Sequence, residues 1–374
     1  MNASGCASPG CACRDRKPAY PSDLADAEWS VLEGEARGVM AELVAVAGRP
    51  MVHDLRAVLD AIGYVTRYGI EWRALPVDFP PHEAVYAFFL RWSRRGLPER
   101  LAARLRGRLR ILAGRRELPT AGCVDSQTVR AAETVGAAAC GYDAGKKLKG
   151  QKRHVVVDTL GLLLCVMVTA ASVQDRDGAH PVLALLREKF STVRLVWADG
   201  GYAGRLQVWA RQVLGLAVTI VKRSDDLRGF VVLPRRWVVE RTFAWLVRCR
   251  RLVRIYERKP EHHEAMIWWA TVHQMTRRLT RELAGLPPQA AGVTRHRCRS
   301  CPAPTGAARS CNSWPLSRGE PGEEANWPPS SRSRTSTASA SSCRNRPTRA
   351  TSTRSDQLSM GPCPPALKPL SAGS

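Results

Sequence analysis

Acidic residues are scarce in this chain of 374 residues. Only 33 Asp and Glu stand against 57 Lys and Arg, which leaves a formal net charge of +24 and a pI near 10.3. Such an excess costs self-repulsion in the folded state. We therefore expect a polyanionic partner rather than a neutral or acidic one.

Long apolar runs are also missing. The longest, residues 160–171, falls short of the ~20 residues that a membrane-spanning helix needs. The N-terminus has no basic segment followed by an apolar one, so we expect no secretion signal and a cytoplasmic protein. The hydrophobic share of 44% still permits a sizeable core, and the length suits two or three domains.

The 12 cysteines show no framework of the kind found in small secreted domains. Cys298 and Cys301 form a C-x-x-C pair that suits zinc if two more ligands join it. No second C-x-x-C pair or H-x₃₋₅-H follows. The sequence therefore favours free thiols in a reducing cytosol.

Composition divides the chain into four parts. Residues 1–20 are small, polar and Cys-rich, which predicts a loose leader. Residues 21–115 carry apolar stripes at helical spacing, and residues 120–285 mix strand-like and helix-like segments. Residues 286–374 are dominated by Ser, Arg, Pro, Thr and Ala, and no Val, Ile, Phe or Tyr follows Val293. This last part cannot bury enough apolar area to offset its ordering entropy, so we predict a disordered tail.

Two of the helical stripes are especially regular. Asp54 is placed to cap a helix that carries apolar residues at 55, 58, 59, 62 and 65, and Pro98 opens another with Leu at 101, 105 and 109. In the third part the pattern predicts three strands, a helix, a strand, a helix, a strand and a helix. The predicted ranges are 121–129, 154–158, 162–169, 181–190, 193–198, 205–214, 217–221 and 237–248. This order predicts an α/β domain, a mixed sheet with helices on its faces.

Three carboxylates stand out by context. Asp125 lies within an apolar strand pattern, Asp199 ends one before two glycines, and Glu240 lies among bulky residues on a predicted helix. Buried carboxylates are costly unless paired or bound to metal, and three of them converging would suit one or two Mg²⁺ ions. Ordinary roles remain open: Asp199 as a turn or cap residue, and Glu240 in an ion pair with Arg236 or Arg241.

Four further aspartates compete for the same role by pattern alone. Asp143 has no distinguishing context. Asp158 precedes Thr-Leu-Gly and is expected to serve a turn, while Asp175 and Asp177 precede a helix and are expected to cap it. Composition and spacing alone therefore do not determine which of these carboxylates form a catalytic, metal-binding set.

Six blocks, in order, resemble the signature blocks of bacterial insertion-sequence transposases with a DDE triad. They begin at Asp125 (DSQTVR), Gly141 (GYDAGKK), Lys152 (KRHVVVDTLG), Val173 (VQDRDG), Trp197 (WADGGY) and Leu233 (LPRRWVVERTFAWL). The resemblance runs from about residue 20 to 285. It implies a ribonuclease-H-like mixed sheet with flanking helices, after an all-helical N-terminal domain. In this family the first Asp is on the first strand, the second ends the fourth, and the Glu is on a later helix.

The resemblance also implies the site. It makes Asp125, Asp199 and Glu240 the catalytic and metal-binding residues for Mg²⁺, with Mn²⁺ as a substitute. Relatives carry a Tyr-x-x-Arg-x-x-x-Glu-x₆-Lys pattern around the glutamate. Here the Tyr position is Leu233 and the Lys position is Val247, with Arg248 beside it as a replacement phosphate contact.

Basic clusters near these carboxylates predict contacts to the DNA backbone. The residues chosen are Lys146, Lys147, Lys149, Lys152, Arg153, Arg236, Arg241 and Arg248. The helical region 21–115 is expected to bind the element's terminal inverted repeats. Target DNA and a second copy of the chain, in a homodimer or larger assembly on DNA, complete the expected partners.

The implied reaction is cleavage at the element's ends, followed by attack of the freed 3′-hydroxyl on target DNA. The alternative is a catalytically inactive remnant that only binds DNA. A basic structural protein would match the charge but not the three placed carboxylates. The expected location is the bacterial cytoplasm, at the nucleoid.

Overall fold

The computed structural model describes residues 11, 13, 16–43, 51–221 and 236–286. The predicted tail, Cys298, Cys301 and Leu233 lie outside these residues. All described residues belong to one compact unit.

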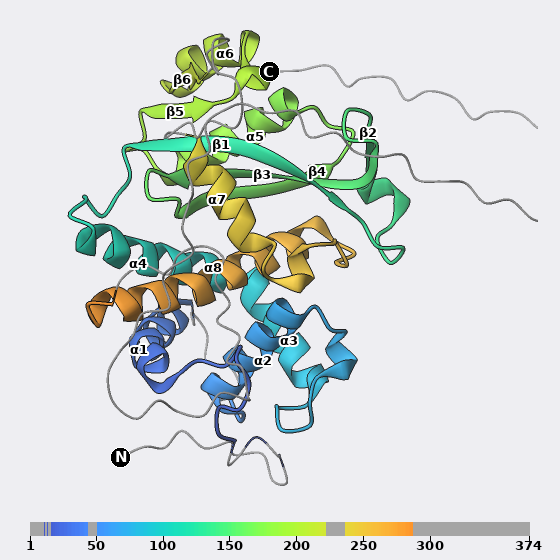
Figure 1. The fold of residues 1–374 in the computed structure, drawn as a ribbon, viewed down its shortest axis with the longest axis vertical. Coiled ribbons are helices and arrows are strands. Elements are labelled where there is room, and N and C mark those ends of the chain that lie inside the picture. The colour runs from blue at the N-terminus through green and yellow to red at the C-terminus, as the bar shows by residue number, and fades with distance from the viewer. Residues whose placement is uncertain (1–10, 12, 14–15, 44–50, 222–235, 287–374) are drawn as a thin grey trace, which may run out of the picture. The chain divides into compact units, whose positions relative to one another are not determined.

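Five helices form a layer on one side of the described fold (Figure 1). They are α1 (Asp26–Leu43), α2 (Leu55–Tyr68), α3 (His82–Arg94), α4 (Leu97–Leu112) and α8 (Pro260–Leu283). The long helix α8 packs against α1, α2 and α4, although it comes from the far end of the described chain. The apolar stripes of α2, α3 and α4 therefore bury against a helix that follows the sheet in sequence.

Six strands form one curled, mixed sheet. They are β1 (Ala121–Arg130), β2 (Gly141–Asp143), β3 (Leu148–Asp158), β4 (Leu163–Ala170), β5 (Leu195–Ala198) and β6 (Ala217–Ile220). The strand order is β4-β3-β1-β5-β6, and the short β2 pairs with the start of β3. β1, β3 and β4 are antiparallel neighbours, whereas β1, β5 and β6 run parallel. The sheet thus changes from antiparallel to parallel at β1.

Alternate residues of the central strands face opposite layers, as the period of two in a strand requires. Cys123 and Val157 belong to the apolar cluster of the helical layer. Val124 and Val156 belong to a second cluster with α5 (Asp175–Lys189) and α6 (Arg205–Leu214) on the other face. Helix α7 (Trp237–Leu246) packs against β1, β3 and α8. The described fold is therefore α/β, as the sequence predicts.

Two predictions that depend on one side chain bonding to the nearby backbone are confirmed. The Asp54 carboxylate accepts a hydrogen bond from the backbone N–H of Ala57, so the predicted cap of α2 is confirmed. The Asp158 carboxylate accepts from the N–H groups of Leu160 and Leu162, which confirms its turn role.

One capping prediction is wrong. Helix α5 begins at Asp175, six residues earlier than the predicted range, and Gln174 occupies its N-cap. Asp175 and Asp177 lie inside the first turn, where negative charge favours the positive end of the helix dipole. Within the described helices, none is long and apolar enough to cross a lipid bilayer.

Candidate active site

The sheet topology brings Asp125 and Asp199 to neighbouring positions. The parallel ladder of β1 and β5 ends with the pair Cys123 and Trp197. Asp125 and Asp199 each lie two residues further along, at the carboxyl end of the parallel pair. These two residues are 74 positions apart in the sequence, yet they lie at corresponding positions because β1 and β5 run in the same direction.

Arg236 connects Glu240 to this edge. Arg236 is the N-cap residue of α7, and Glu240 lies in the first turn. The Arg236 Nη2 atom lies 3.7 Å from Asp199 Oδ2 and 3.6 Å from Glu240 Oε1. The predicted ion pair of Glu240 with Arg236 is therefore present, and the same guanidinium also faces the second aspartate.

The two aspartates have further backbone partners. Asp125 accepts a hydrogen bond from its neighbouring Ser126 N–H at 2.7 Å, and Asp199 Oδ1 accepts from Gly201 N–H at 2.8 Å. Asp199 thereby caps a short 3-10 turn, Gly200–Tyr202, which is the ordinary role left open above. Its other oxygen still faces Arg236, so the cap role and a ligand role use different atoms.

The charge of Asp125 is the costly one. Its pKa is raised to about 6, first by burial and also by the nearby Asp199 carboxylate, while the Ser126 N–H and Arg236 act in the opposite direction. The buried Cys123 thiol has its pKa raised to about 12, by burial and by Asp125. These pKa shifts indicate a region of negative electrostatic potential around Asp125, where a bound cation would be favoured.

The donor set is made of carboxylate oxygens, which Mg²⁺ prefers. The carboxylate oxygens of Asp125, Asp199 and Glu240 do not all lie within 4.8 Å of one another in this structure. Glu240 is 48% exposed and has room to move. The residues fit a hard divalent ion, with Arg236 providing the positive charge near two of them.

A polar network beside Asp125 was not predicted. Ser126 Oγ donates to Asp175 Oδ1 at 2.6 Å, and Lys152 Nζ lies 2.8 Å from the same oxygen. Thr128 Oγ1 donates to Asp143 at 2.6 Å, and Lys152 lies 3.8 Å from that carboxylate. The sequence feature that could have indicated this network is the alternation of polar side chains along β1, where Ser126 and Thr128 point to the same side.

Two residues chosen as DNA contacts are buried. Arg153 is fully buried, where it donates to Gln127 Oε1 and to the Leu252 carbonyl, and lies over the Phe243 ring. The side chain of Lys152 is 7% exposed and is held by the network just described. The sequence treated the run 146–153 as one surface, but its second half is a central strand. These two side chains therefore do not present their charge to a DNA backbone.

The other basic residues chosen as DNA contacts lie either at the β2–β3 turn or on and just after α7. Lys146, Lys147 and Lys149 are exposed around the β2–β3 turn, where Lys147 has a φ of 50°. Arg248 is exposed just beyond α7. Arg241 lies between the rings of Trp237 and Trp245, at 4.5 and 4.8 Å, and donates to the Leu160 carbonyl.

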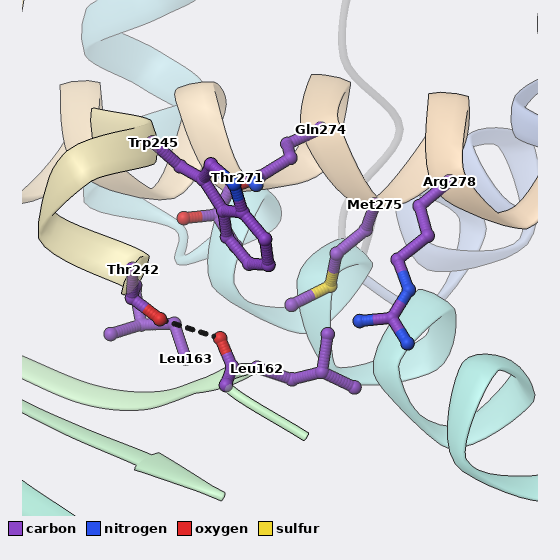
Figure 2. A pocket seen from close by; sticks show the side chains of 9 residues that line it. Leu162, Leu163, Thr242, Trp245, Thr271, Gln274, Met275 and Arg278 are labelled. Carbon is purple, nitrogen blue, oxygen red and sulfur yellow. Dashed lines mark hydrogen bonds between the residues drawn. The ribbon is translucent and has the colours of Figure 1, made fainter. Parts of the chain in front are cut away.

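A small pocket lies elsewhere, between α7, α8 and the turn before β4 (Figure 2). Trp245 and Met275 cover it, and Thr242 donates to the Gly161 carbonyl at its edge. The three carboxylates are not among its lining residues. It is therefore separate from the candidate active site.

Comparison with known proteins adds the family. The model of the "Transposase DDE domain" family matches residues 116–275, and that of the "Putative transposase of IS4/5 family" matches residues 24–102. A protein of Burkholderia cepacia, "Putative transposase for insertion sequence element IS402", is 34% identical over 125 residues. That match covers 32% of this chain and 59% of the relative. No solved structure matches.

Proposed function

The chain belongs to the insertion-sequence transposases with a DDE domain, and from this premise we propose that it cuts DNA at its element's ends and joins them to target DNA. In the first step a water oxygen attacks phosphorus, and the bond to the 3′-oxygen breaks to leave a 3′-hydroxyl. In the second step that hydroxyl attacks a target phosphodiester, and a target 3′-oxygen leaves. Each step exchanges one P–O bond for another, so no external energy source is needed.

We assign catalysis to Asp125, Asp199 and Glu240. The single observation that supports this best is that Asp125 and Asp199 both lie two residues beyond the last pair of the parallel β1–β5 ladder, with Arg236 linking Asp199 to Glu240. The Asp158 carboxylate, by contrast, accepts a hydrogen bond within a turn and forms a buried ion pair with Arg110. Asp143 and Asp175 are engaged by Lys152. Three of the four competing aspartates thus already have structural roles.

The three carboxylates would hold Mg²⁺, or Mn²⁺ in its place. When bound, divalent ions at such a site stabilise the attacking and leaving oxygens of an in-line displacement at phosphorus. Asp125 lies within β1 and Asp199 directly follows β5, whereas Glu240 is in the first turn of α7 and more exposed. Arg236 keeps the two exposed carboxylates from repelling each other, and is also available to a DNA phosphate.

We propose that the basic residues that are exposed or partly exposed bind the DNA backbone. These are Lys146, Lys147 and Lys149 on one side, and Arg236, Arg241 and Arg248 around α7. Arg241 is held by two Trp rings and a carbonyl, so it is pre-oriented and its charge remains partly accessible. Such contacts position a duplex without reading its sequence. The helical region 21–115 is the proposed reader of the terminal repeats.

The family also implies a ribonuclease-H-like fold, which we propose for residues 120–285. The antiparallel β4-β3-β1 group followed by parallel β5 and β6 supports it. Without the short β2, Asp199 follows the fourth strand, as the family pattern requires. Helix α8 is shared with the helical layer, so the two proposed domains have one continuous apolar cluster between them.

The test is an end-cleavage and strand-transfer assay with labelled DNA from the borders of the gene. Asp125→Asn should abolish both products in Mg²⁺ and in Mn²⁺ while leaving DNA binding within about twofold, because only a negative charge is removed. The matched control is Asp177→Asn, an exposed aspartate that should leave both unchanged. Wild-type protein that binds the ends without cutting them would establish the inactive remnant instead. Loss of binding together with cleavage in Asp125→Asn would indicate a structural role.

A further inference from the structure

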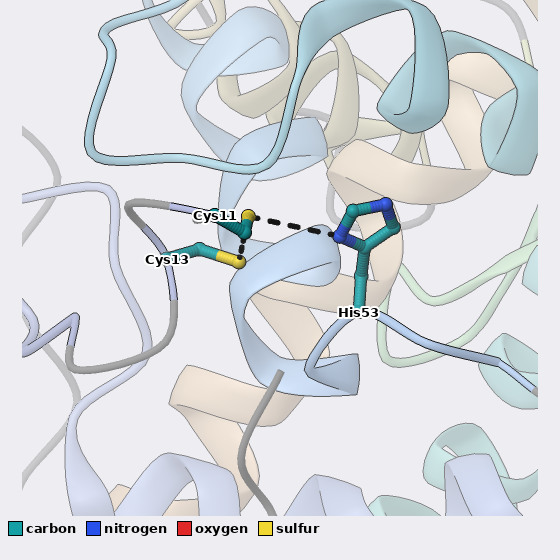
Figure 3. A group of neighbouring side chains, drawn as sticks. All are labelled: Cys11, Cys13 and His53. Atoms are coloured by element: carbon teal, nitrogen blue, oxygen red, sulfur yellow. Dashed lines mark hydrogen bonds between the residues drawn. The ribbon is translucent and has the colours of Figure 1, made fainter. Parts of the chain in front are cut away.

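Three soft-metal ligands meet far from the carboxylates. The Sγ atoms of Cys11 and Cys13 are 2.9 Å apart, and Cys11 Sγ lies 3.8 Å from His53 Nδ1. All three ligand atoms lie within 4.8 Å of one another. Figure 3 shows the two thiols pointing toward the imidazole, which comes from a different segment of the chain.

The protein holds this group from both sides. Cys13 is 2% exposed and packs on Ala57, in the first turn of α2. His53 immediately precedes Asp54, whose side chain caps the same turn. Both halves of the group are therefore attached to the N-terminus of one well-formed helix.

A second anchor follows the thiols in sequence. The side chain of Arg16 is 4% exposed and lies 2.6 Å from Asp23 and 3.3 Å from Asp60. Its guanidinium also lies 3.9 Å from the Phe79 ring centre. This charge network fixes the position of the chain at Arg16, three residues after Cys13.

Two thiolates and an imidazole suit zinc better than a hard ion. In a tetrahedral site with ordinary bond lengths, a sulfur and a nitrogen ligand lie about 3.6 Å apart and two sulfurs about 3.8 Å apart. The observed sulfur–nitrogen separation of 3.8 Å is already close to that geometry. The sulfurs would separate by about 0.9 Å, which a small rotation of one Cys side chain provides.

We propose that Cys11, Cys13 and His53 are three ligands of a structural Zn²⁺ ion, which ties the leader to the first turn of α2. The ion is distinct from the Mg²⁺ of the carboxylate site in both ligands and position. Its role is to fix the start of the helical layer, and the proposal does not depend on catalysis. Sequence reasoning considered zinc only at Cys298 and Cys301, because the pair C-x-C and a His some 40 residues later form no familiar spacing.

Metal content of the full-length chain is the first test. The protein is purified under reducing conditions with zinc supplied, and its metals are measured by plasma mass spectrometry. We expect about one zinc per wild-type chain, and at least a tenfold loss in Cys11→Ser, Cys13→Ser and His53→Gln. Cys140→Ser, at a half-buried thiol elsewhere, and the double variant Cys298→Ser/Cys301→Ser should retain the zinc. Zinc that is lost only in the double variant, or equal in all variants, would overturn the assignment.

Two further readouts can be made on the wild-type protein, with a folded variant as the comparison. Cobalt supplied in place of zinc should give the intense thiolate-to-cobalt absorption in wild type and in Cys140→Ser, but not in Cys13→Ser. A chelator should lower the unfolding temperature of wild type and leave that of folded His53→Gln unchanged, because only bound metal stabilises by mass action. A Cys11–Cys13 disulfide in the protein as purified, or an unfolding temperature indifferent to chelator, would refute the proposal.

Discussion

The guanidinium of Arg236 lies 3.7 Å from the carboxylate of Asp199, a residue that directly follows strand β5. The same nitrogen lies 3.6 Å from Glu240, one turn further along α7. One cation thus separates two anions that a divalent metal ion would draw together. Arg236 is the N-cap of α7, so the start of this helix determines where the charge stands.

Removing this charge should make the protein more responsive to metal. In Arg236→Gln the two carboxylates repel each other, and both are partly exposed, so the loss of stability without metal should be about 0.5 kcal/mol, a change of about 1–2 °C in unfolding temperature. Added Mg²⁺ should then raise the unfolding temperature more in Arg236→Gln than in wild type. Differential scanning fluorimetry with a Mg²⁺ titration measures both.

The control is Arg248→Gln, which removes an exposed arginine just after the same helix. It should change neither the metal-free stability nor the response to Mg²⁺. An equal Mg²⁺ response in wild type and Arg236→Gln would mean that the ion does not bind beside Asp199 and Glu240.

The exposed lysines of the β2–β3 turn should account for part of the salt dependence of DNA binding. Replacing Lys146, Lys147 and Lys149 with Gln removes three phosphate contacts, so the slope of log K against log salt should become shallower by about 3. Arg153→Gln should leave the slope unchanged, because this side chain is fully buried. Fluorescence anisotropy with a short duplex between 50 and 200 mM salt gives the slopes. A smaller slope in Arg153→Gln, with the fold intact, would contradict the assignment.

The sequence predicts the helices and strands better than it predicts how they pair and which side chains they bury. The strands 154–158 and 162–169 and the cap at Asp54 were expected because each depends on local periodicity or on one side chain. The extension of β3 back to Leu148 was not, since residues 150–153 are held by pairing with β1 and residues 148–150 by pairing with β2. Arg153 was therefore assigned to the surface when it belongs to the core.

The candidate site shows the same division. Each carboxylate was recognisable, but only the parallel pairing of β1 with β5 places Asp125 beside Asp199. The engagement of Arg236 with both Asp199 and Glu240 depends on the position of α7 relative to the sheet, which no local pattern encodes. The meeting of Cys11 and Cys13 with His53 is likewise a tertiary event, and spacing rules gave no signal for it.

Close packing of α5 on β3 should make Gly178 irreplaceable. A Cβ there would lie 2.1 Å from the ring of His154, which is fully buried. Gly178→Ala should destabilise the protein by about 1–3 kcal/mol, since neither the helix nor the strand can move freely. Urea unfolding measures this.

The matched control is Gly34→Ala, in the middle of α1, where an added Cβ meets nothing within 4 Å. It should stabilise the protein by about 0.5–1 kcal/mol through helix propensity. Gly178→Ala should also weaken the Ser126–Asp175 contact, because Asp175 lies in the first turn of the same helix. Equal stability of the two variants would show that α5 is not tightly seated on β3.

A carboxyl group on the outer edge of the sheet should make stability fall as pH rises. Glu264 of α8 accepts a hydrogen bond from the Val168 N–H at 2.8 Å, and burial raises the pKa of Glu264 to about 7. The folded state therefore holds a proton that the unfolded state loses near the ordinary glutamate pKa of 4.5. The resulting stability is fully present below that value and is lost as pH rises toward 7.

Glu264→Gln keeps an acceptor for the Val168 N–H and has no charge to bury. It should match wild type near pH 4.5 and exceed it at pH 8, by at most about 3 kcal/mol. Glu261→Gln, an exposed position on the same helix, should show no such divergence. Urea unfolding of the three proteins at several pH values isolates this group, because buried histidines such as His263, whose pKa burial lowers to about 3, contribute equally to all of them. A difference between Glu264→Gln and wild type that does not grow between pH 5 and 8 would mean that Glu264 is already ionised in the folded state, and that its contact with Val168 is a charged one.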